Sequence, residues 1–158
     1  MHDALRLPGR VLGIDVGGSG TRVVLLENGT VTPQPDGPPM NVNLTEGFAG
    51  HLLQIIKAAD ATAAGVGLPG LRQEAQAREL SQTLSEQAGC PVYVTGDADT
   101  AQAGAFLGGP GVVVIAGTGS MAFGRNGEHR ARAGGPAAPR HGAAGDRAPA
   151  RAAPRSDE

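Results

Sequence analysis

Residues 10–32 read RVLGIDVGGSGTRVVLLENGTVT, and this stretch decides the fold. The β-branched and aliphatic run up to Val16 is typical of a short buried strand, and four small residues from Gly17 to Gly20 end it. The sequence then returns as a second strand, 21–26, rather than as a helix. Asn28-Gly29 favours a type I′ turn into a third strand, 30–32. The chain is therefore predicted to open with an antiparallel meander.

Beyond this meander, strands and helices alternate. Apolar residues at helical spacing predict a helix over 48–59, with Thr45 as its cap, and further helices over 77–88 and 99–107. Strands are predicted over 64–68 and 91–95, and a hairpin pairs 112–116 with 120–123. This order predicts an α/β fold with one mixed sheet that carries helices on both faces.

Composition changes sharply near the C-terminus. Phe123 is the last Val, Ile, Leu, Met, Phe, Tyr or Cys, and the chain holds 26 Gly and 12 Pro in 158 residues. A segment without large apolar side chains cannot offset the roughly 1–2 kcal/mol per residue of backbone ordering entropy. We expect an N-terminal lobe over 1–109, an orphan β-hairpin over 110–127 and a disordered Ala/Arg/Pro/Gly tail over 128–158. The hairpin's exposed apolar edge could pair chains into a homo-oligomer.

Charge and cysteine content exclude several classes of protein. A net charge of −2 and a pI near 6.1 give no footprint for nucleic acid or an anionic membrane. The single Cys90 excludes an internal disulfide, and the four histidines have no zinc-ligand spacing. No apolar window approaches a signal peptide or a membrane span, so a cytoplasmic location is the expectation.

The glycine cluster is the first candidate site. Gly17, Gly18, Ser19 and Gly20 can present backbone N–H groups to a phosphate without obstruction by a Cβ atom. Asp15, at the end of the preceding strand, could hold a hydrated Mg²⁺ against that phosphate. A dinucleotide or Walker loop fits poorly, because both open a helix and the Walker loop needs a Lys. A glycine-rich hairpin without a ligand is the alternative.

Two segments together resemble one known superfamily. The run 13–21 looks like the first phosphate motif of the sugar kinase, Hsp70 and actin superfamily, and more closely like its N-acetylglucosamine kinase and BadF/BadG/BcrA/BcrD ATPase branch. The run 94–98, followed by 103–106 and 111–120, is similar to that branch's Asn-Asp-Ala helix and second phosphate motif. The resemblance covers residues 10–135 and implies a ribonuclease-H-like fold, with ATP and Mg²⁺ bound between two lobes.

The resemblance also implies roles for individual residues. Asp97 matches the general base that acts on the sugar hydroxyl, although a helix N-cap fits the same position. Asn41 resembles a sugar-contacting asparagine, with a turn residue as the alternative. Five further residues match phosphate-binding positions of the family: Thr21, Gly117, Thr118, Gly119 and Ser120. In the family, the positions of Thr118 and Gly119 lie between the sugar and the γ-phosphate.

The sequence departs from the family at two places. Gly96 replaces the asparagine that usually precedes the aspartate. The stretch Arg132-Ala133-Gly134-Gly135 matches the start of a family motif, but Pro136 stands where tryptophan is expected and nothing after it resembles the family. A frameshift or premature end in a longer gene would produce such a change.

The function implied is ATP-dependent phosphorylation of an amino sugar such as N-acetylglucosamine, carried out by a protein of which this chain is one lobe. We expect negligible catalysis from the chain as written. A BadF-type ATPase that drives a conformational change in a partner is one alternative, although a lone Cys90 does not suit the iron–sulfur activators. A non-catalytic interaction fragment is the other.

Overall fold

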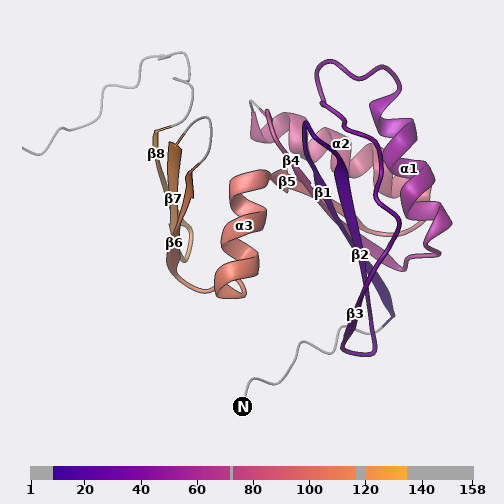
Figure 1. Cartoon of the computed structure of the whole chain (residues 1–158), viewed down its shortest axis with the longest axis horizontal. Coiled ribbons are helices and arrows are strands. Elements are labelled where there is room, and N and C mark those ends of the chain that lie inside the picture. The colour runs from indigo at the N-terminus through magenta and orange to yellow at the C-terminus, as the bar shows by residue number, and fades with distance from the viewer. Residues whose placement is uncertain (1–8, 72, 117–119, 135–158) are drawn as a thin grey trace, which may run out of the picture.

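The computed structural model describes residues 9–71, 73–116 and 120–134 (Figure 1). Its larger part is a five-stranded mixed sheet in the order β3-β2-β1-β4-β5. The strands are β1 (Arg10–Val16), β2 (Thr21–Glu27), β3 (Thr30–Pro33), β4 (Ala63–Leu68) and β5 (Val92–Gly96). The first three strands form the predicted antiparallel meander, and β4 and β5 then add in parallel to β1.

The turn between β2 and β3 has the predicted geometry. Glu27 pairs with Thr30 across it, which leaves Asn28 and Gly29 as the two central residues. Both have positive φ, 51° and 79°, as a type I′ turn requires. This turn sets the register in which β2 and β3 pair.

Alternation along the strands puts one face of the sheet in the core. Leu12, Ile14 and Val16 of β1 are at most 2 % exposed, while Asp15 between them is exposed. The buried face packs against α1 (Phe48–Ala58) and α2 (Glu74–Ala88), through residues that include Leu52 and Leu84. The main hydrophobic core therefore lies between the sheet and these two helices.

The third helix lies on the opposite face of the sheet. In α3 (Asp97–Phe106), Thr100 sits so close over Gly67 of β4 that a Cβ added to Gly67 would lie 2.6 Å from the Thr100 hydroxyl oxygen. Gly67 alternates with the core residues Val66 and Leu68, so it faces away from α1 and α2. The expected arrangement, a mixed sheet with helices on both faces, is thus confirmed.

Two serines of α2 cover the outer edge of β5. The Ser85 hydroxyl accepts a hydrogen bond from the backbone N–H of Val92 (2.8 Å), and the Ser81 hydroxyl accepts one from Val94 (2.9 Å). Each serine also donates to a carbonyl one helical turn earlier. The helix thereby satisfies backbone groups that an edge strand would otherwise leave unpaired.

The hairpin predicted near the C-terminus is a three-stranded antiparallel sheet. Its strands are β6 (Gly111–Ala116), β7 (Ser120–Asn126) and β8 (His129–Gly134), in the order β6-β7-β8. Met121 and Phe123 of β7 pack with Ala98 of α3 in a second, smaller core. This sheet therefore stands beside α3, on the side away from the larger core (Figure 1).

Strand β8 corrects the expectation of disorder over 128–158 and of a two-stranded hairpin ending at 127. All six residues of β8 are exposed, so the strand contributes backbone hydrogen bonds to β7 rather than apolar burial. Its lack of apolar residues therefore did not exclude a strand. The rest of the expected tail, 135–158, lies outside the described residues.

Helix boundaries differ from the prediction in small ways. The N-cap of α1 is Gly47, at φ 66°, and not Thr45, whose hydroxyl instead accepts the backbone N–H of Asn41. A tight turn over 41–45 takes up the chain before the helix, so the capping position moves two residues on. Among the described residues, none of the helices is long and apolar enough to cross a membrane.

Candidate functional site

The glycine cluster forms a closed turn between β1 and β2. Gly17 and Gly20 exchange backbone hydrogen bonds of 2.9 and 3.4 Å, which leaves Gly18 and Ser19 at the tip. Both tip residues are exposed, and their N–H groups have no acceptor among the described residues. The turn thus offers two free backbone donors at the end of β1, as a phosphate site needs.

Thr21 holds this turn from behind. It is fully buried, its hydroxyl donates to the carbonyl oxygen of Pro38 (2.7 Å), and its N–H donates to that of Gly37 (3.1 Å). Its donors are therefore already used within the protein. In this conformation Thr21 fixes the loop rather than contacting a phosphate directly, which differs from the role expected from the resemblance.

Asp15 projects from β1 on the same side of the sheet as α3. It alternates with the buried Ile14 and Val16, its carboxylate is exposed, and no ion pair joins it to another described residue. The described residues contain no cluster of three or more metal-ligating side chains. Mg²⁺ is commonly held by one or two carboxylates with phosphate oxygens and water, so a single carboxylate beside a phosphate loop fits that ion.

Asp97 begins α3 directly after β5. The N-cap is Gly96 and makes no side-chain cap, so Asp97 occupies the first helical position. Its side chain is exposed, and its one hydrogen bond within the described part of the chain is to the next backbone N–H, that of Ala98 (2.8 Å). The outer carboxylate oxygen is accordingly available to accept a proton from a substrate.

The sheet register brings Asp15 and Asp97 to the same end of the sheet, where the parallel strands β1, β4 and β5 finish. Asp15 lies opposite Gly67 in β4, and Gly67 lies opposite Thr95 in β5. Two strand spacings therefore separate Asp15 from Thr95, about 10 Å between Cα atoms. Asp97 follows Thr95 by two residues and is the first residue of α3. A metal-bound phosphate at Asp15 and a hydroxyl at Asp97 could be neighbours across this distance.

Asn41 occupies a turn at the same end of the sheet, where the N–H of the preceding Met40 donates to the carbonyl oxygen of Gly17 (3.3 Å). Its side-chain oxygen accepts the backbone N–H of Asn43 (2.9 Å), which leaves the amide NH₂ group as its free polar end. Asn43, which sequence reasoning did not select, ties this turn to the β4 loop by donating to the carbonyl of Gly70 (3.4 Å). The asparagine is thus a turn residue whose remaining hydrogen-bonding capacity is that of a donor.

The second phosphate motif is only partly described. Ser120 begins β7 and is exposed, whereas Gly117, Thr118 and Gly119 lie outside the described residues. Gly134 of β8, at φ 81°, approaches the Ser120 carbonyl so closely that no Cβ atom would fit. Sequence reasoning placed Gly134 in a family motif but gave it no role, since the pairing of β8 with β7 was not foreseen.

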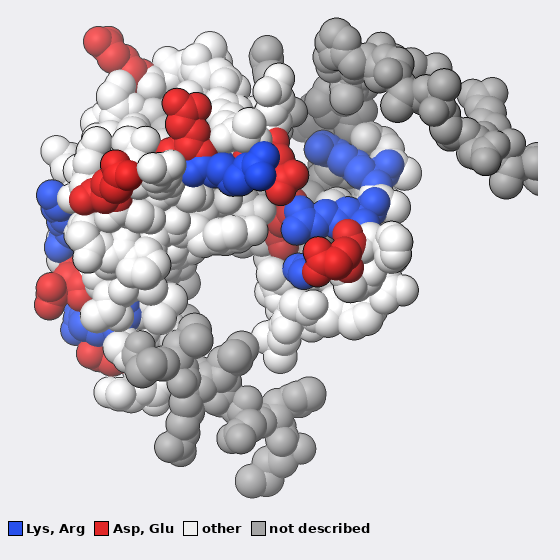
Figure 2. Space-filling view, turned by 180° about the vertical axis from the view of Figure 1, so that it is seen from behind, with Lys and Arg blue, Asp and Glu red and all other residues white. Residues whose placement is uncertain are grey.

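Charge is unevenly distributed around the site. Arg130 of β8 forms an ion pair with Asp99 of α3 (3.3 Å), which connects the small sheet to the helix that carries Asp97. Figure 2 shows basic side chains gathered over the small sheet and a hollow between that sheet and the larger part of the molecule. The sheet contributes three arginines there: Arg125, Arg130 and Arg132.

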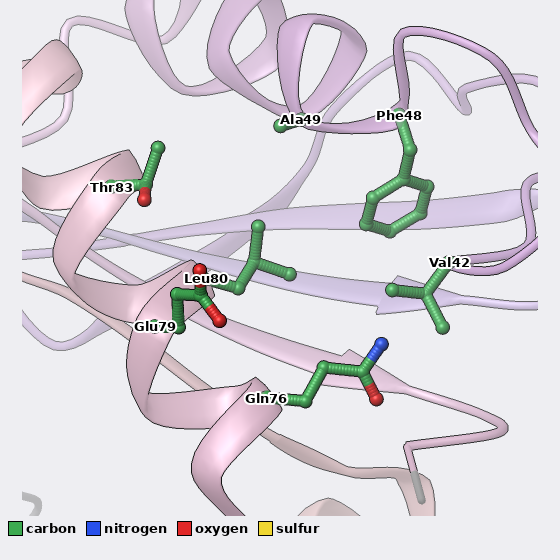
Figure 3. Close-up of a pocket in the computed structure, with 7 residues that line it drawn as sticks. All are labelled: Val42, Phe48, Ala49, Gln76, Glu79, Leu80 and Thr83. Carbon is green, nitrogen blue, oxygen red and sulfur yellow. The ribbon is translucent and has the colours of Figure 1, made fainter.

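A separate cavity of about 280 Å³ lies between α1 and α2 (Figure 3). Phe48 and Leu80 line it with Val42, which follows Asn41 in the chain, and Gln76 and Glu79 add polar groups. These helices cover the face of the sheet opposite to Asp15 and α3. The cavity is therefore not the place where the predicted phosphate and base residues meet.

Comparison with known proteins shows likeness in structure only. No protein-family model and no curated protein sequence matches the chain. Among solved structures, a candidate N-acetylglucosamine kinase from Porphyromonas gingivalis is similar with a TM-score of 0.59 and 22 % identity over 77 % of this chain and 46 % of that one. One from Chromobacterium violaceum gives 0.58 and 24 % over 83 % and 50 %.

A glucokinase from Parabacteroides distasonis is similar with a TM-score of 0.60 and 18 % identity, over 78 % of this chain and 46 % of that one. The chain thus spans about half the length of the structures it matches. At these identities the likeness establishes the fold, and the resemblance to N-acetylglucosamine kinases read from the sequence is confirmed at that level. The chain has a sugar-kinase-like fold and covers about half of each of these structures.

Proposed function

We propose that the chain is the N-terminal lobe of an ATP-dependent kinase that phosphorylates a hydroxyl of an amino sugar such as N-acetylglucosamine. The observation that supports this most directly is that three features lie at the end of the sheet where β1 and β5 finish: the exposed carboxylate of Asp15, the free N–H groups of Gly18 and Ser19, and the exposed Asp97. The structural neighbours named as sugar kinases support the same class.

Each residue has a distinct task in this proposal. The N–H groups of Gly18 and Ser19 donate to phosphate oxygens, and Asp15 orients the water shell of Mg²⁺, which neutralises charge on the transferring phosphoryl group when bound. Asp97 orients the sugar hydroxyl and accepts its proton as the hydroxyl oxygen bonds to the γ-phosphorus of ATP, whose bond to the β–γ bridging oxygen breaks so that ADP leaves. Asn41 donates its amide N–H to a sugar oxygen. Thr21 keeps the glycine turn in place.

The lobe alone is expected to bind phosphate weakly and to turn over no sugar. Phosphoryl transfer depends on positioning and on charge stabilisation from both sides of the transferred group. The described residues of this chain supply one such side, and the relatives by structure are about twice as long. Catalysis would therefore need a second lobe opposite Asp15 and Asp97.

The binding half of the proposal can be tested by an amide NMR titration of the 158-residue chain with Mg·ATP and with Mg·tripolyphosphate. We expect concentration-dependent shifts at Gly18 and Ser19 with both ligands, and their loss in Asp15→Asn. The Asn28-Gly29 turn is the internal control, because it is also a tight turn, but the carboxylate beside it, Glu27, is already paired with Arg10 (3.3 Å). Equal shifts at both turns, or none at the glycine cluster, would contradict phosphate binding.

The catalytic half needs a fusion that supplies the second lobe of a sugar kinase. In that protein Asp97→Asn should lower kcat for amino-sugar phosphorylation by roughly 10²–10⁴-fold, as the loss of a general base does, while nucleotide binding is retained. Asp99→Asn is the matched control, because Asp99 is a second aspartate in the first turn of α3, two residues after Asp97, and pairs with Arg130. Unchanged turnover in Asp97→Asn would exclude its role as the base.

A further inference from the structure

Three of the four sheet edges in the described part of the chain are protected against pairing with another strand. Strand β3 has only four residues and ends at Pro33, which has no N–H to donate. The outward N–H groups of Val92 and Val94 in β5 are bonded to the serines of α2. Strand β8 carries Arg130 and Arg132, and charged side chains are a common defence of an edge.

Strand β6 has none of these protections. Its sequence is Gly-Val-Val-Val-Ile-Ala, without a charge or a proline. Val112 and Val114 are 63 % and 71 % exposed, and Ile115 is 36 % exposed. Strand β7 occupies one side of β6, and no described residue donates or accepts a hydrogen bond across the other side. A six-residue apolar edge of this kind is a template for another strand.

We propose that the free edge of β6 pairs antiparallel with the same edge of a second copy of this chain, which joins the two small sheets into one six-stranded sheet. A two-fold axis through the strand is compatible with the sequence. Side chains of directly opposed residues share a face, so either Val113 or Val114 lies opposite its own counterpart. In both registers the exposed valines of the two copies adjoin on the outer face of the sheet.

A second copy fits this edge better than the chain's own C-terminal segment. No Val, Ile or Leu follows Ile115 in the sequence, and after Phe123 the only apolar side chains are alanines, so that segment has no β-branched apolar residue to set opposite the valines of β6. Charge gives no obstacle, because β6 is uncharged, and the outer face beside it is made of small residues: Ala122, Gly124, Ala131 and Ala133. Opposed β-branched residues also make favourable cross-strand pairs.

The oligomeric state of the 158-residue chain tests this pairing. Light scattering after size exclusion should give twice the 15.8 kDa mass of the chain at high concentration and the single mass on dilution. Val114→Lys should shift the equilibrium to the single mass, because it places like charges at the two-fold axis or beside it. Val31→Lys is the matched control, since Val31 is a valine of similar exposure (60 %) on the protected edge strand β3.

Cross-linking locates the interface even if Val114→Lys fails to fold. In a Cys90→Ala background, either Val113→Cys or Val114→Cys should form an intermolecular disulfide, because opposed residues of paired strands have Cα atoms within disulfide reach. Val31→Cys should not. A chain that stays at the single mass at every concentration overturns the proposal, as does association that Val31→Lys abolishes and Val114→Lys does not. Pairing only with a different polypeptide that covers β6 also overturns it.

Discussion

At the scale of single residues, the contact between Gly67 and Thr100 decides how closely α3 approaches the sheet. The Cβ, Cγ2 and hydroxyl oxygen of Thr100 all lie within 3.2 Å of the position that a Cβ atom on Gly67 would take. Threonine is stiff at χ1, so it cannot easily turn aside. The start of α3, and with it Asp97, therefore depends on the absence of a side chain at residue 67.

We predict that Gly67→Ala lowers the free energy of unfolding by about 1–3 kcal/mol, the usual cost of overpacking. Gly65→Ala is the control, because Gly65 lies on the same strand and face and nothing is within 4 Å of its added Cβ. That variant should be neutral or more stable by about 0.4–1 kcal/mol. Urea unfolding measures both. Equal stability of the two variants would show that α3 does not rest on Gly67.

Residue roles could be predicted from the sequence where one local rule decides them. Positive φ at Asn28 and Gly29 follows from their residue types, and the end of α2 at Gly89 follows from its left-handed C-cap. The Thr45 cap was wrong, because a turn with Asn41 competes for the same hydroxyl. The inward role of Thr21 was missed, since its acceptor, Pro38, is brought near only by the tertiary fold.

At the scale of elements, α2 replaces a neighbouring strand for β5. Its helical periodicity was predicted from Ala77, Leu80, Leu84 and Ala88, but that pattern concerns the apolar face. The serines at 81 and 85 carry no such signal, because exposed polar residues are common on helices. Only the placement of α2 along the edge of β5 reveals their function.

We predict that Ser81→Ala lowers the free energy of unfolding by roughly 1–3 kcal/mol, because it leaves the Val94 N–H without its acceptor. Hydrogen exchange at Val94 should accelerate more than at Val66 in the neighbouring strand. Gln82→Ala is the control on the same helix, since the one described partner of the Gln82 side chain is the exposed Glu86, and it should change stability by less than about 0.5 kcal/mol. If both variants lose the same stability, the edge bonds contribute nothing specific.

The existence of β8 was the element that sequence reasoning could not supply. Its residues alternate between Arg and Ala after His129, with no large apolar side chain to mark a buried face. Pairing with β7 along six residues gives the strand its stability instead. Composition predicts which segments can form a core, but it does not predict strands that join a sheet through backbone hydrogen bonds without apolar burial.

At the scale of the whole molecule, the two sheets have separate cores of unequal size. The larger core lies between the five-stranded sheet and two helices, while the smaller one consists of Ala98, Met121 and Phe123 with the partly buried Val113. A small core is the weaker of the two, because stability scales with the apolar area buried. The small sheet should therefore open before the larger one.

We predict that Phe123→Ala unfolds the small sheet and leaves the five-stranded sheet folded. Hydrogen exchange should show lost protection over β6, β7 and β8, with protection in β1 and β4 unchanged. Tyr93→Ala is the control, because it also truncates an aromatic residue, but one that is 65 % exposed. Uniform loss of protection across both sheets in Phe123→Ala would show instead that the molecule unfolds as one unit.

The serine-covered edge of β5 also limits how large an assembly can become. A molecule with two open strand edges can add copies at both and grow without end, as fibres do. Here the other described edges are short, charged or already bonded to a helix. Association through one self-complementary edge is isologous and uses that edge up in both copies. Growth by strand addition would therefore stop at two molecules. The hydroxyl groups of Ser81 and Ser85 thus act against polymerisation, although they protect β5 and lie far from β6, the strand that pairs.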